Sequence, residues 1–496
     1  MEGNTDTVEL PRSKKMKIGS TPKDNIGVLP EAILHHILSF LDMKEVLQTS
    51  FLSRRWRYTW KSVQVMNFDY SLWEPEEKSS SSSQNKKKKK IIRPYVKRVL
   101  SKEGCMNFLD RVIYVFRDPT TNIQKLKLSE HYCHDRGRLD TLLLYVLPNI
   151  KEVHLESNGD KYLYELPCSL FTSEKLEVFV LAHKIAKYIC PVVLPATMCS
   201  NCRLTTLSLQ CCLLPHGDSN HELVLKNPVL KKLALINCDH HELKVVNIIA
   251  PQLKELEVKN CLGDGDYDYG DYDYTERVCF CEIKLCTPSL LLLRFDGQPY
   301  LDFSLGDLSS LITADIWFDH WLEESQLPLN FLRCLHRLSN VSALKLHPAS
   351  SESNNPLHEP LSSFRNLRHL TLGRVSCIPS VTKVLQSSPF VETLVLRGID
   401  TVTIFEEKYW RKELPMQDRF HHLRCFKIAG CLHFHENELK LLTFMLKNSM
   451  ALENIAITYM ASEGQAEEVT EFKHKLLTLL EAYSKVTIHF DEHKDG

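Results

Sequence analysis

One spacing of apolar residues recurs along most of the chain, and it constrains the fold more than any other feature. In each copy three apolar residues follow the pattern h-x-x-h-x-h, and the central residue returns about every 26 residues. A repeat of this length predicts a solenoid, in which each unit buries its apolar side against its neighbours. The copies span residues 123–128, 150–155, 176–181, 204–209, 230–235, 253–258, 290–295, 311–316, 341–346, 367–372, 391–396, 423–428 and 452–457.

Each copy predicts one short strand, followed by a segment that returns the chain to the next strand. Stacked copies form a parallel sheet in which the h positions point inward and the residues between them point outward. The outward residues line the concave face of such a solenoid, which suits the binding of an extended protein partner. The candidate substrate-binding residues are therefore Thr206, Ser208, Lys232, Glu255, Glu257, His369 and Thr371.

A cysteine recurs three residues after the last apolar position, at Cys212, Cys238, Cys261 and Cys431. With this cysteine the pattern resembles the L-x-x-L-x-L-x-x-N/C consensus of leucine-rich repeats. The resemblance implies an α/β fold, a horseshoe of about 13 repeats. Prolines precede several strands at a fixed offset, and we interpret them as first residues of strands, which can lack the ladder N–H. They are Pro148, Pro228, Pro251 and Pro288.

The block of residues 24–64 has a different pattern, typical of three short helices. Pro30 suits a first helical turn, a second helix fits Lys44 to Leu52, and Ser53 can cap a third. About forty residues form too small a core to bury so many large apolar groups, so some are expected to contact a partner. The groups in question are Leu29, Pro30, Ile33, Leu34, Ile37, Leu38, Leu41, Leu47, Leu52, Trp56 and Trp60.

This block resembles an F-box of the plant type. The resemblance rests on the Leu29-Pro30 start, the run Ile-Leu-x-x-Ile-Leu-Ser-Phe-Leu over 33–41 and the ending Leu-Ser-Arg-Arg-Trp-Arg-x-x-Trp over 52–60. Phe51 departs from it, because an aliphatic residue usually stands there. The tail is similar to the FBD domain in its segments 436–439, 446–448, 451–454 and 485–490. Nearly the whole chain thus resembles F-box/FBD/leucine-rich-repeat proteins.

The resemblance implies a subunit of a cullin-RING (SCF-type) ubiquitin ligase. The F-box would dock on a Skp-type adaptor, and through it on the cullin and RING subunits, while the repeats bind a protein substrate for ubiquitination. The docking surface it implies comprises the eleven residues from Leu29 to Trp60 named above, which alternatively pack the helical core. The second hypothesis is a leucine-rich-repeat scaffold that acts outside a ubiquitin ligase. A third keeps the ligase and adds a small molecule in the horseshoe.

The expected organisation has five parts. Residues 1–23 are a disordered basic tail, 24–64 the F-box, and 65–120 a linker that contains the Ser/Lys-rich tract 79–90 and the first solenoid elements. Residues 121–415 are leucine-rich repeats, and 416–496 are FBD-like repeats and a cap, with a helix over 471–483 and a strand over 486–490. The acidic tract 264–274 is an insertion in a return loop, because removing its eleven residues restores the spacing of 26. A solvated acidic loop is expected in preference to a calcium loop, since Tyr269 and Thr275 replace the required Gly and Glu.

Composition argues against several other classes. The formal net charge is −1, with Lys and Arg in modest excess before residue 118 and acidic residues in excess after it, which gives no reason to expect nucleic acid. No apolar run reaches the length of a membrane span. Seventeen scattered cysteines favour reduced thiols in the nucleus or cytoplasm. The lysine run 86–90 is either a nuclear localisation signal or a charged flexible tip.

We find no signature of a P-loop, a zinc protease or a serine hydrolase, so the chain is expected to be non-catalytic. Three clusters have metal-ligand chemistry, but the repeat register assigns Cys212 to the core, and the histidines fall in polar loops. We therefore expect no metal and no cofactor. The clusters are Cys199/Cys202/Cys211/Cys212, His131/Cys133/His134 and His433/His435/Glu436.

Overall fold

The computed structural model describes most of the repeat strands and the N-terminal helices, and the structural statements below concern those residues alone. The tail 1–23, the tract 79–90, the insertion 264–274 and the candidates His131, Cys133, His134, Cys202, Cys261, His433 and His435 lie outside them. The described ranges are 29–69, 104–116, 120–129, 136–157, 164–183, 192–200, 203–238, 243–259, 281–297, 303–305, 308–318, 335–347, 363–373, 381, 384–397, 420–431, 436–460, 466–481 and 485–493.

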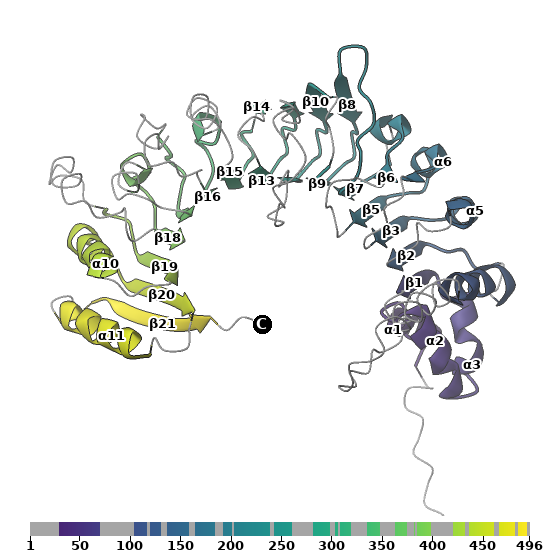
Figure 1. Ribbon diagram of the computed structural model, residues 1–496, viewed down its shortest axis with the longest axis horizontal. Helices are drawn as coiled ribbons and strands as arrows, with labels where there is room; N and C mark the ends of the chain where they lie inside the picture. Colours follow the sequence, from purple (N-terminus) through teal and green to yellow (C-terminus); the bar gives the residue numbers. More distant parts are fainter. Residues whose placement is uncertain are drawn as a thin grey trace, which may run out of the picture.

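A parallel sheet of fifteen described strands lines the inner side of an open arc (Figure 1). The strands follow one another in chain order, and each pairs in parallel with the next. They are β1 (Val65–Asp69), β2 (Lys125–Ser129), β3 (Glu152–Ser157), β5 (Val178–His183), β7 (Thr206–Gln210), β9 (Lys232–Ile236), β11 (Glu255–Lys259), β13 (Leu292–Gly297), β15 (Thr313–Phe318), β16 (Ala343–His347), β17 (His369–Gly373), β18 (Thr393–Arg397), β19 (Cys425–Cys431), β20 (Asn454–Met460) and β21 (Thr487–His493).

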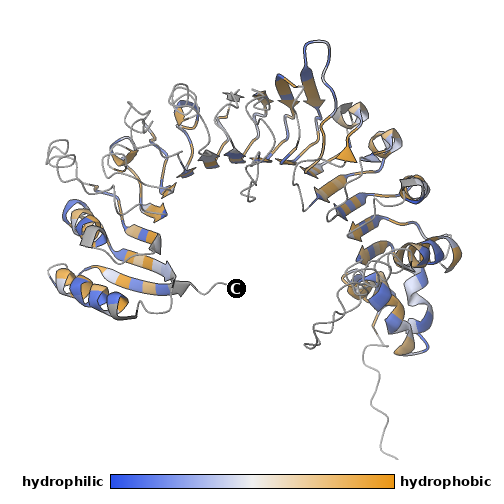
Figure 2. Cartoon of the chain, in the orientation of Figure 1, coloured by the Kyte–Doolittle hydropathy of each residue, from blue (hydrophilic) through white to orange (hydrophobic). Residues whose placement is uncertain are grey.

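The predicted parallel sheet is confirmed, and every h-x-x-h-x-h copy contributes a strand to it. Burial alternates along the strands as expected, so that Leu207 and Leu209 of β7 are buried while Thr206 and Ser208 are half-buried. The inward side chains form one continuous apolar core between the sheet and the return segments. Figure 2 shows the resulting mixture of apolar and polar residues along each strand.

The return segments differ along the arc, which the sequence analysis did not predict. Helices lie outside the sheet near both ends, whereas in the middle the return segments form a second parallel sheet on the convex side (Figure 1). The helices are α5 (Arg136–Val146), α6 (Cys168–Thr172), α10 (Glu436–Asn448) and α11 (Ala466–Leu480), with a 3-10 turn η6 (Ala196–Ser200). The second sheet has the order β14 (Phe303–Leu305), β12 (Glu282–Cys286), β10 (Val245–Ile249), β8 (Glu222–Lys226), and β4 (Tyr164–Glu165) pairs with β6 (Val192–Val193).

The prolines before the strands have a different position from the one we expected. Pro251 precedes the first residue of β11 by four positions and lies in a turn that is closed by a 3.0 Å hydrogen bond from Leu253 N–H to the Ala250 carbonyl. Pro288 lies in the corresponding turn, which Leu290 N–H closes on the Thr287 carbonyl at 3.1 Å. Proline suits the second position of a turn because its ring fixes φ near the required value. Pro251 and Pro288 therefore set the turns that lead into β11 and β13 and are not the first residues of these strands.

Two of the consensus cysteines, Cys212 and Cys238, occupy the buried positions that the repeat register predicted. Cys212 and Cys238 are both buried, and their Sγ atoms lie 3.6 Å apart in adjacent repeats. Cys211 and Asn237, which precede them, both have a φ of 51°. In each repeat the residue with this left-handed backbone conformation ends the strand and turns the chain, so that the thiol of the following cysteine points into the core.

Close packing on the concave side requires a glycine in β17. The His347 ring of β16 stacks on Trp317 of β15, with ring centroids 4.0 Å apart, and His347 is buried. A Cβ at Gly373 would lie 1.8 Å from Nδ1 of this ring. A larger residue at Gly373 must therefore displace the imidazole from Trp317.

We predict that Gly373→Ala lowers the free energy of unfolding by about 1–3 kcal/mol, because the added methyl group overpacks this site. Thermal or urea unfolding of the full chain measures the effect. In a His347→Ala background the same substitution should cost much less, since the ring is gone. Gly104→Ala is the matched control, because a Cβ at Gly104 has no atom within 4 Å. Equal losses in the two backgrounds would contradict the contact.

Candidate interaction surfaces

The N-terminal helices form as their local sequence dictates. Helix α1 (Glu31–Leu38) follows Pro30, and α2 (Met43–Gln48) is capped by Asp42, whose Oδ1 accepts the Lys44 N–H at 2.7 Å. Glu45 Oε2 accepts the Asp42 N–H at 3.2 Å, which completes a capping box. The later elements are η1 (Thr49–Phe51), α3 (Trp56–Thr59) and η2 (Trp60–Ser62), so the third helix begins three residues beyond Ser53.

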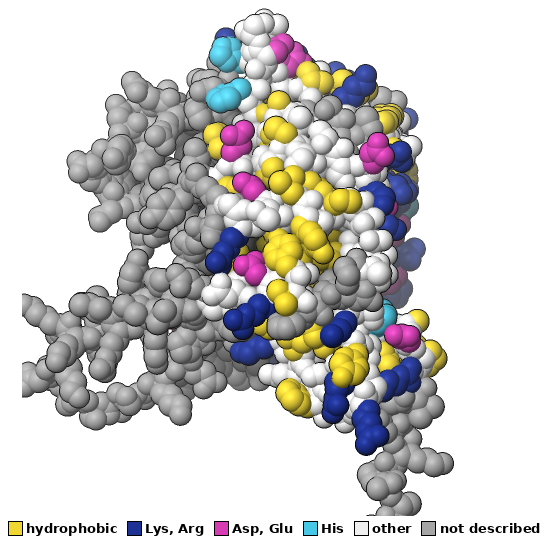
Figure 3. Space-filling model, turned by 90° about the vertical axis from the view of Figure 1, so that its right-hand side faces the viewer, with side chains coloured by type: hydrophobic (Ala, Val, Ile, Leu, Met, Phe, Trp, Pro, Cys, Tyr) yellow, Lys and Arg dark blue, Asp and Glu magenta, His cyan; other side chains and the backbone are white. Residues whose placement is uncertain are grey.

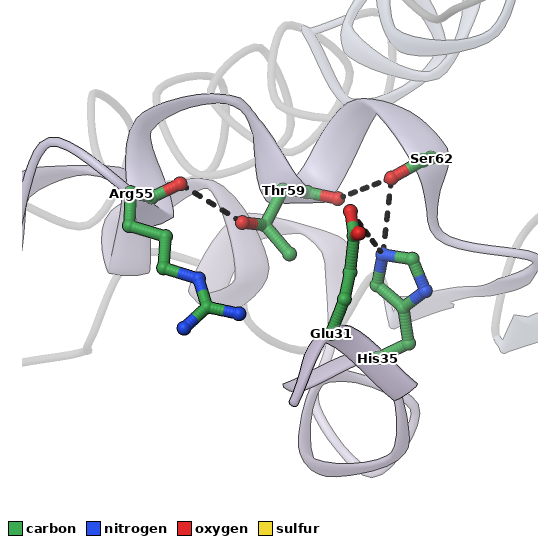
Figure 4. A network of polar contacts seen from close by, with 5 residues as sticks. All are labelled: Glu31, His35, Arg55, Thr59 and Ser62. Atoms are coloured by element: carbon green, nitrogen blue, oxygen red, sulfur yellow. Dashed lines mark hydrogen bonds and ion pairs between the residues drawn. The ribbon is translucent and has the colours of Figure 1, made fainter. Parts of the chain in front are cut away.

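A short polar network joins the first helix to the last (Figure 4). His35 Nε2 of α1 lies 3.0 Å from Ser62 Oγ of η2, and Glu31 Oε1 approaches the same nitrogen at 4.0 Å. Ser62 Oγ donates to the Thr59 carbonyl at 3.1 Å. Helices distant in sequence are thereby held side by side around the buried Leu34, Leu38, Trp56 and Trp60.

Asp42 also joins the helical block to the solenoid. Its Oδ2 accepts the backbone N–H of Asp69, in the edge strand β1, at 2.7 Å. Met43 and Val46 of α2 are fully buried in the same core as Met66 and Phe68 of β1. Burial raises the pKa of the Asp42 carboxyl, although both backbone hydrogen bonds favour its ionised form. The first edge of the long sheet is thus covered by the helices that precede it.

The predicted docking residues divide into three groups. Leu34, Leu38, Trp56 and Trp60 are buried in the helical core, while Leu29, Leu41 and Leu47 are half-buried against it. Pro30, Ile33, Ile37 and Leu52 are exposed.

Three further apolar side chains in this block are exposed and were absent from our docking set. Phe51 is 89% exposed, Phe40 72% and Tyr58 62%. The sequence did contain a signal, since Phe51 departs from the usual pattern by being large and aromatic. We call Ile33, Ile37, Phe40, Phe51, Leu52 and Tyr58 the N-terminal apolar surface. Figure 3 views this end of the arc, where hydrophobic side chains lie beside Lys and Arg.

The concave face carries cross-strand ion pairs that include several predicted substrate residues. Lys232 Nζ lies 2.9 Å from Glu255 Oε1, its register partner on the next strand. Glu257 contacts Lys259 at 2.9 Å and Arg294 at 3.7 Å. His369 is exposed, and Thr206, Ser208 and Thr371 are half-buried. All seven predicted residues therefore lie on the concave face of the sheet, away from the apolar core.

A second charged group lies nearer the helical block. Lys125 pairs with Glu152 at 2.7 Å, and Lys127 with Glu156 at 2.9 Å. Partial burial alone would raise the pKa of Glu152, but the hydrogen bond and charge of Lys125 hold it below its ordinary value. Between the two charged groups, the outward positions of β5 and β7 carry no charge. We call Val178, Val180, Ala182, Thr206, Ser208 and Gln210 the uncharged window.

Two kinds of feature have no counterpart among the described residues. No helix there is both long and apolar enough to cross a membrane. Across the same ranges, no three His, Cys, Asp or Glu side chains gather in a way that would hold a metal ion.

Comparison with known proteins identifies the helical block. Residues 26–67 match the F-box domain. An F-box/LRR-repeat protein of Arabidopsis thaliana is 27% identical over 409 residues, which cover 77% of this chain and 82% of the relative. An FBD-associated F-box protein of the same plant is 26% identical over 483 residues, which cover 94% of this chain and 95% of the relative.

Residues 26–67 are thus an F-box, and the chain as a whole is similar to plant F-box/leucine-rich-repeat proteins. The resemblance predicted from the residues is therefore confirmed. Its F-box comprises the helices that cover β1, and its repeats are the parallel strands of the arc. The tail of the repeat body contains β19, α10, β20, α11 and β21.

We predict that Asp42→Ala destabilises the F-box protein by about 2 kcal/mol, because it removes a helix cap and leaves the Asp69 N–H unsatisfied. Chemical unfolding and hydrogen exchange at Asp69 measure the two effects. Asp42→Asn is the matched control, since its side-chain oxygen can still accept one of these hydrogen bonds. Unchanged exchange at Asp69 in the alanine variant would show that the edge strand does not depend on Asp42.

Proposed function

We propose that this protein is the substrate-recognition subunit of an SCF-type ubiquitin ligase. The observation that carries the proposal is an F-box match coinciding with a helical block that leaves large apolar side chains in solvent. Exposed apolar groups of this size on a soluble domain mark a protein-binding surface. In this proposal the F-box docks on a Skp-type adaptor and, through it, on the cullin and RING subunits.

The docking surface we propose refines the set expected from the sequence. Pro30 and the N-terminal apolar surface contact the adaptor, since their side chains are already exposed. Leu34, Leu38, Trp56 and Trp60 act indirectly by packing the core that holds those side chains in place. Aromatic anchors such as Phe51 commonly contribute most to binding at such interfaces.

The repeats hold the protein substrate on the concave face. We place the centre of contact at the uncharged window, because its side chains have no ion pair to break when a partner covers them. The charged groups on either side, Lys125/Glu152 and Lys232/Glu255, would then set orientation. About 13 repeats and an FBD-like cap complete this body in our account, which places the ligase in the nucleus, the cytoplasm or both.

The chain contributes proximity to ubiquitin transfer and supplies no nucleophile. Holding a substrate lysine near a charged conjugating enzyme raises the effective concentration of the two reactants. For that purpose the distance from F-box to concave face must be maintained. The Asp42–Asp69 hydrogen bond and the shared core of α2 and β1 support such a connection.

We predict that Phe51→Ala/Leu52→Ala weakens binding to a Skp-type adaptor at least tenfold, which corresponds to about 1.4 kcal/mol. Calorimetry with purified adaptor measures the affinity, and circular dichroism checks folding. Leu144→Ala is the matched control, because Leu144 is also exposed, at 54%, but lies on α5. If the folded wild type binds no Skp-type adaptor, the ligase proposal fails and a repeat scaffold with another partner replaces it.

Charge reversal on the concave face separates recognition from stability. We predict that Lys232→Glu and Glu255→Lys each change the set of proteins whose ubiquitination depends on this chain, while adaptor binding is unchanged. The double variant Lys232→Glu/Glu255→Lys re-forms an ion pair in the opposite direction. Ubiquitin-remnant proteomics measures capture. If the double variant recovers the wild-type targets, the ion pair has a structural role and does not contribute to substrate recognition.

A further inference from the structure

The two ends of the long sheet are covered to different extents. At the N-terminal end α2 packs on β1, and Asp42 accepts an N–H of that strand. At the other end β21 pairs with β20, and it has no further neighbour in the sheet order of the described residues. In Figure 1 β21 closes the arc, with α11 along its convex side.

The side chains of β21 are less buried than those of the strand before it. Ile455 and Ile457 of β20 are fully buried, whereas Ile488 and Phe490, their register partners in β21, are half-buried. Leu477 of α11, in the same terminal repeat, is 59% exposed. The Lys473 side chain lies over the Phe490 ring, with Nζ 5.0 Å from the ring centroid, but it leaves the ring half-buried. Apolar surface is thus left for another layer.

The backbone of β21 presents a regular row of hydrogen-bonding groups. Thr487 N–H donates to the Glu453 carbonyl at 2.8 Å, so the odd-numbered residues of the strand face β20. Successive peptide groups of a strand alternate in direction. The N–H and carbonyl groups of Ile488, Phe490 and Glu492 therefore point to the open side. Unpaired edges of this kind are templates for pairing with another strand.

We propose that β21 pairs antiparallel with β21 of a second copy of this chain, about a two-fold axis at Phe490. In this register Phe490 faces its own copy and Ile488 faces Glu492 of the second copy. The N–H and carbonyl groups of Ile488, Phe490 and Glu492, which point to the open side of β21, then all form hydrogen bonds with the second chain. In any shifted register, at least one of these three residues on each chain is left without a hydrogen-bonded partner on the other chain.

The side chains favour the same register. His489 of one chain lies opposite Asp491 of the other, and symmetry repeats this pair on the other side of the axis. Directly opposed residues at such non-hydrogen-bonded positions lie about 4.5 Å apart between Cα atoms, which lets an imidazole donate to a carboxylate. An isologous contact of this type closes on itself and gives a dimer. Phe490 and Ile488 lose water on pairing.

Sedimentation velocity of the purified full chain at pH 7 tests the proposal. The wild type should sediment with twice the mass of one chain, and His489→Asp should raise the dimer dissociation constant at least tenfold by opposing two carboxylates. The double variant His489→Asp/Asp491→His exchanges the partners and should restore the dimer. His369→Asp, at an exposed outward position of the internal strand β17, is the matched control and should remain dimeric.

Glu492→Pro tests the backbone part of the contact. It removes an N–H that points away from β20, so pairing with β20 persists while the dimer is lost. If this variant unfolds, the His489→Asp and His489→Asp/Asp491→His variants alone decide the proposal. Both side chains are exposed, so these substitutions leave the fold intact. A monomeric wild type would overturn the proposal. A dimer that survives His489→Asp unchanged would also overturn it, as would failure of the double variant to restore pairing.

Discussion

The parallel ladder between neighbouring repeats is the interaction on which the rest of this structure depends. A five-residue strand such as β7 has two inward leucines, which only a neighbouring strand and its return segment can cover. Each register pair, for example Leu207 with Leu233, extends one core along the arc. The concave face follows from the same ladder, because it brings outward residues from distant parts of the sequence into rows.

A ladder of this kind ends in two edge strands, and the F-box helices cover one of them, β1. Asp42 caps a helix and an edge strand with the same carboxylate, while Met43 and Val46 extend the core under β1. The F-box is therefore part of the packing of the repeats. In the account proposed above, this union fixes how far a captured substrate lies from the ubiquitin-transfer machinery. The dimer proposed for β21 would cover the other end by a different route.

The sequence predicted the strands well because each h-x-x-h-x-h copy reports directly on burial. It did not predict the convex sheet, since Leu223 and Leu225 of β8 form a five-residue alternation inside what we interpreted as a return loop. Pro251 was assigned to a strand because its offset is fixed, but the hydrogen bond that defines its turn cannot be seen in one sequence.

The exposure of the proposed docking residues was predicted only in part, for a reason of geometry. Ile33 and Ile37 differ by one position from Leu34 and Leu38, so both pairs fit an apolar stripe at helical spacing. Which pair faces solvent depends on how α1 packs against α3, and the structure turns the leucines inward. Phe51 follows the same logic, because η1 contains no buried residue and places it outside the helical core.

A cryo-electron microscopy reconstruction of the chain bound to a Skp-type adaptor would test the central claim most directly. The account predicts an adaptor seated on the N-terminal apolar surface, with Phe51 and Leu52 in contact and the concave face open to a substrate. An adaptor bound to the concave face, or to the arc away from the F-box helices, would contradict it.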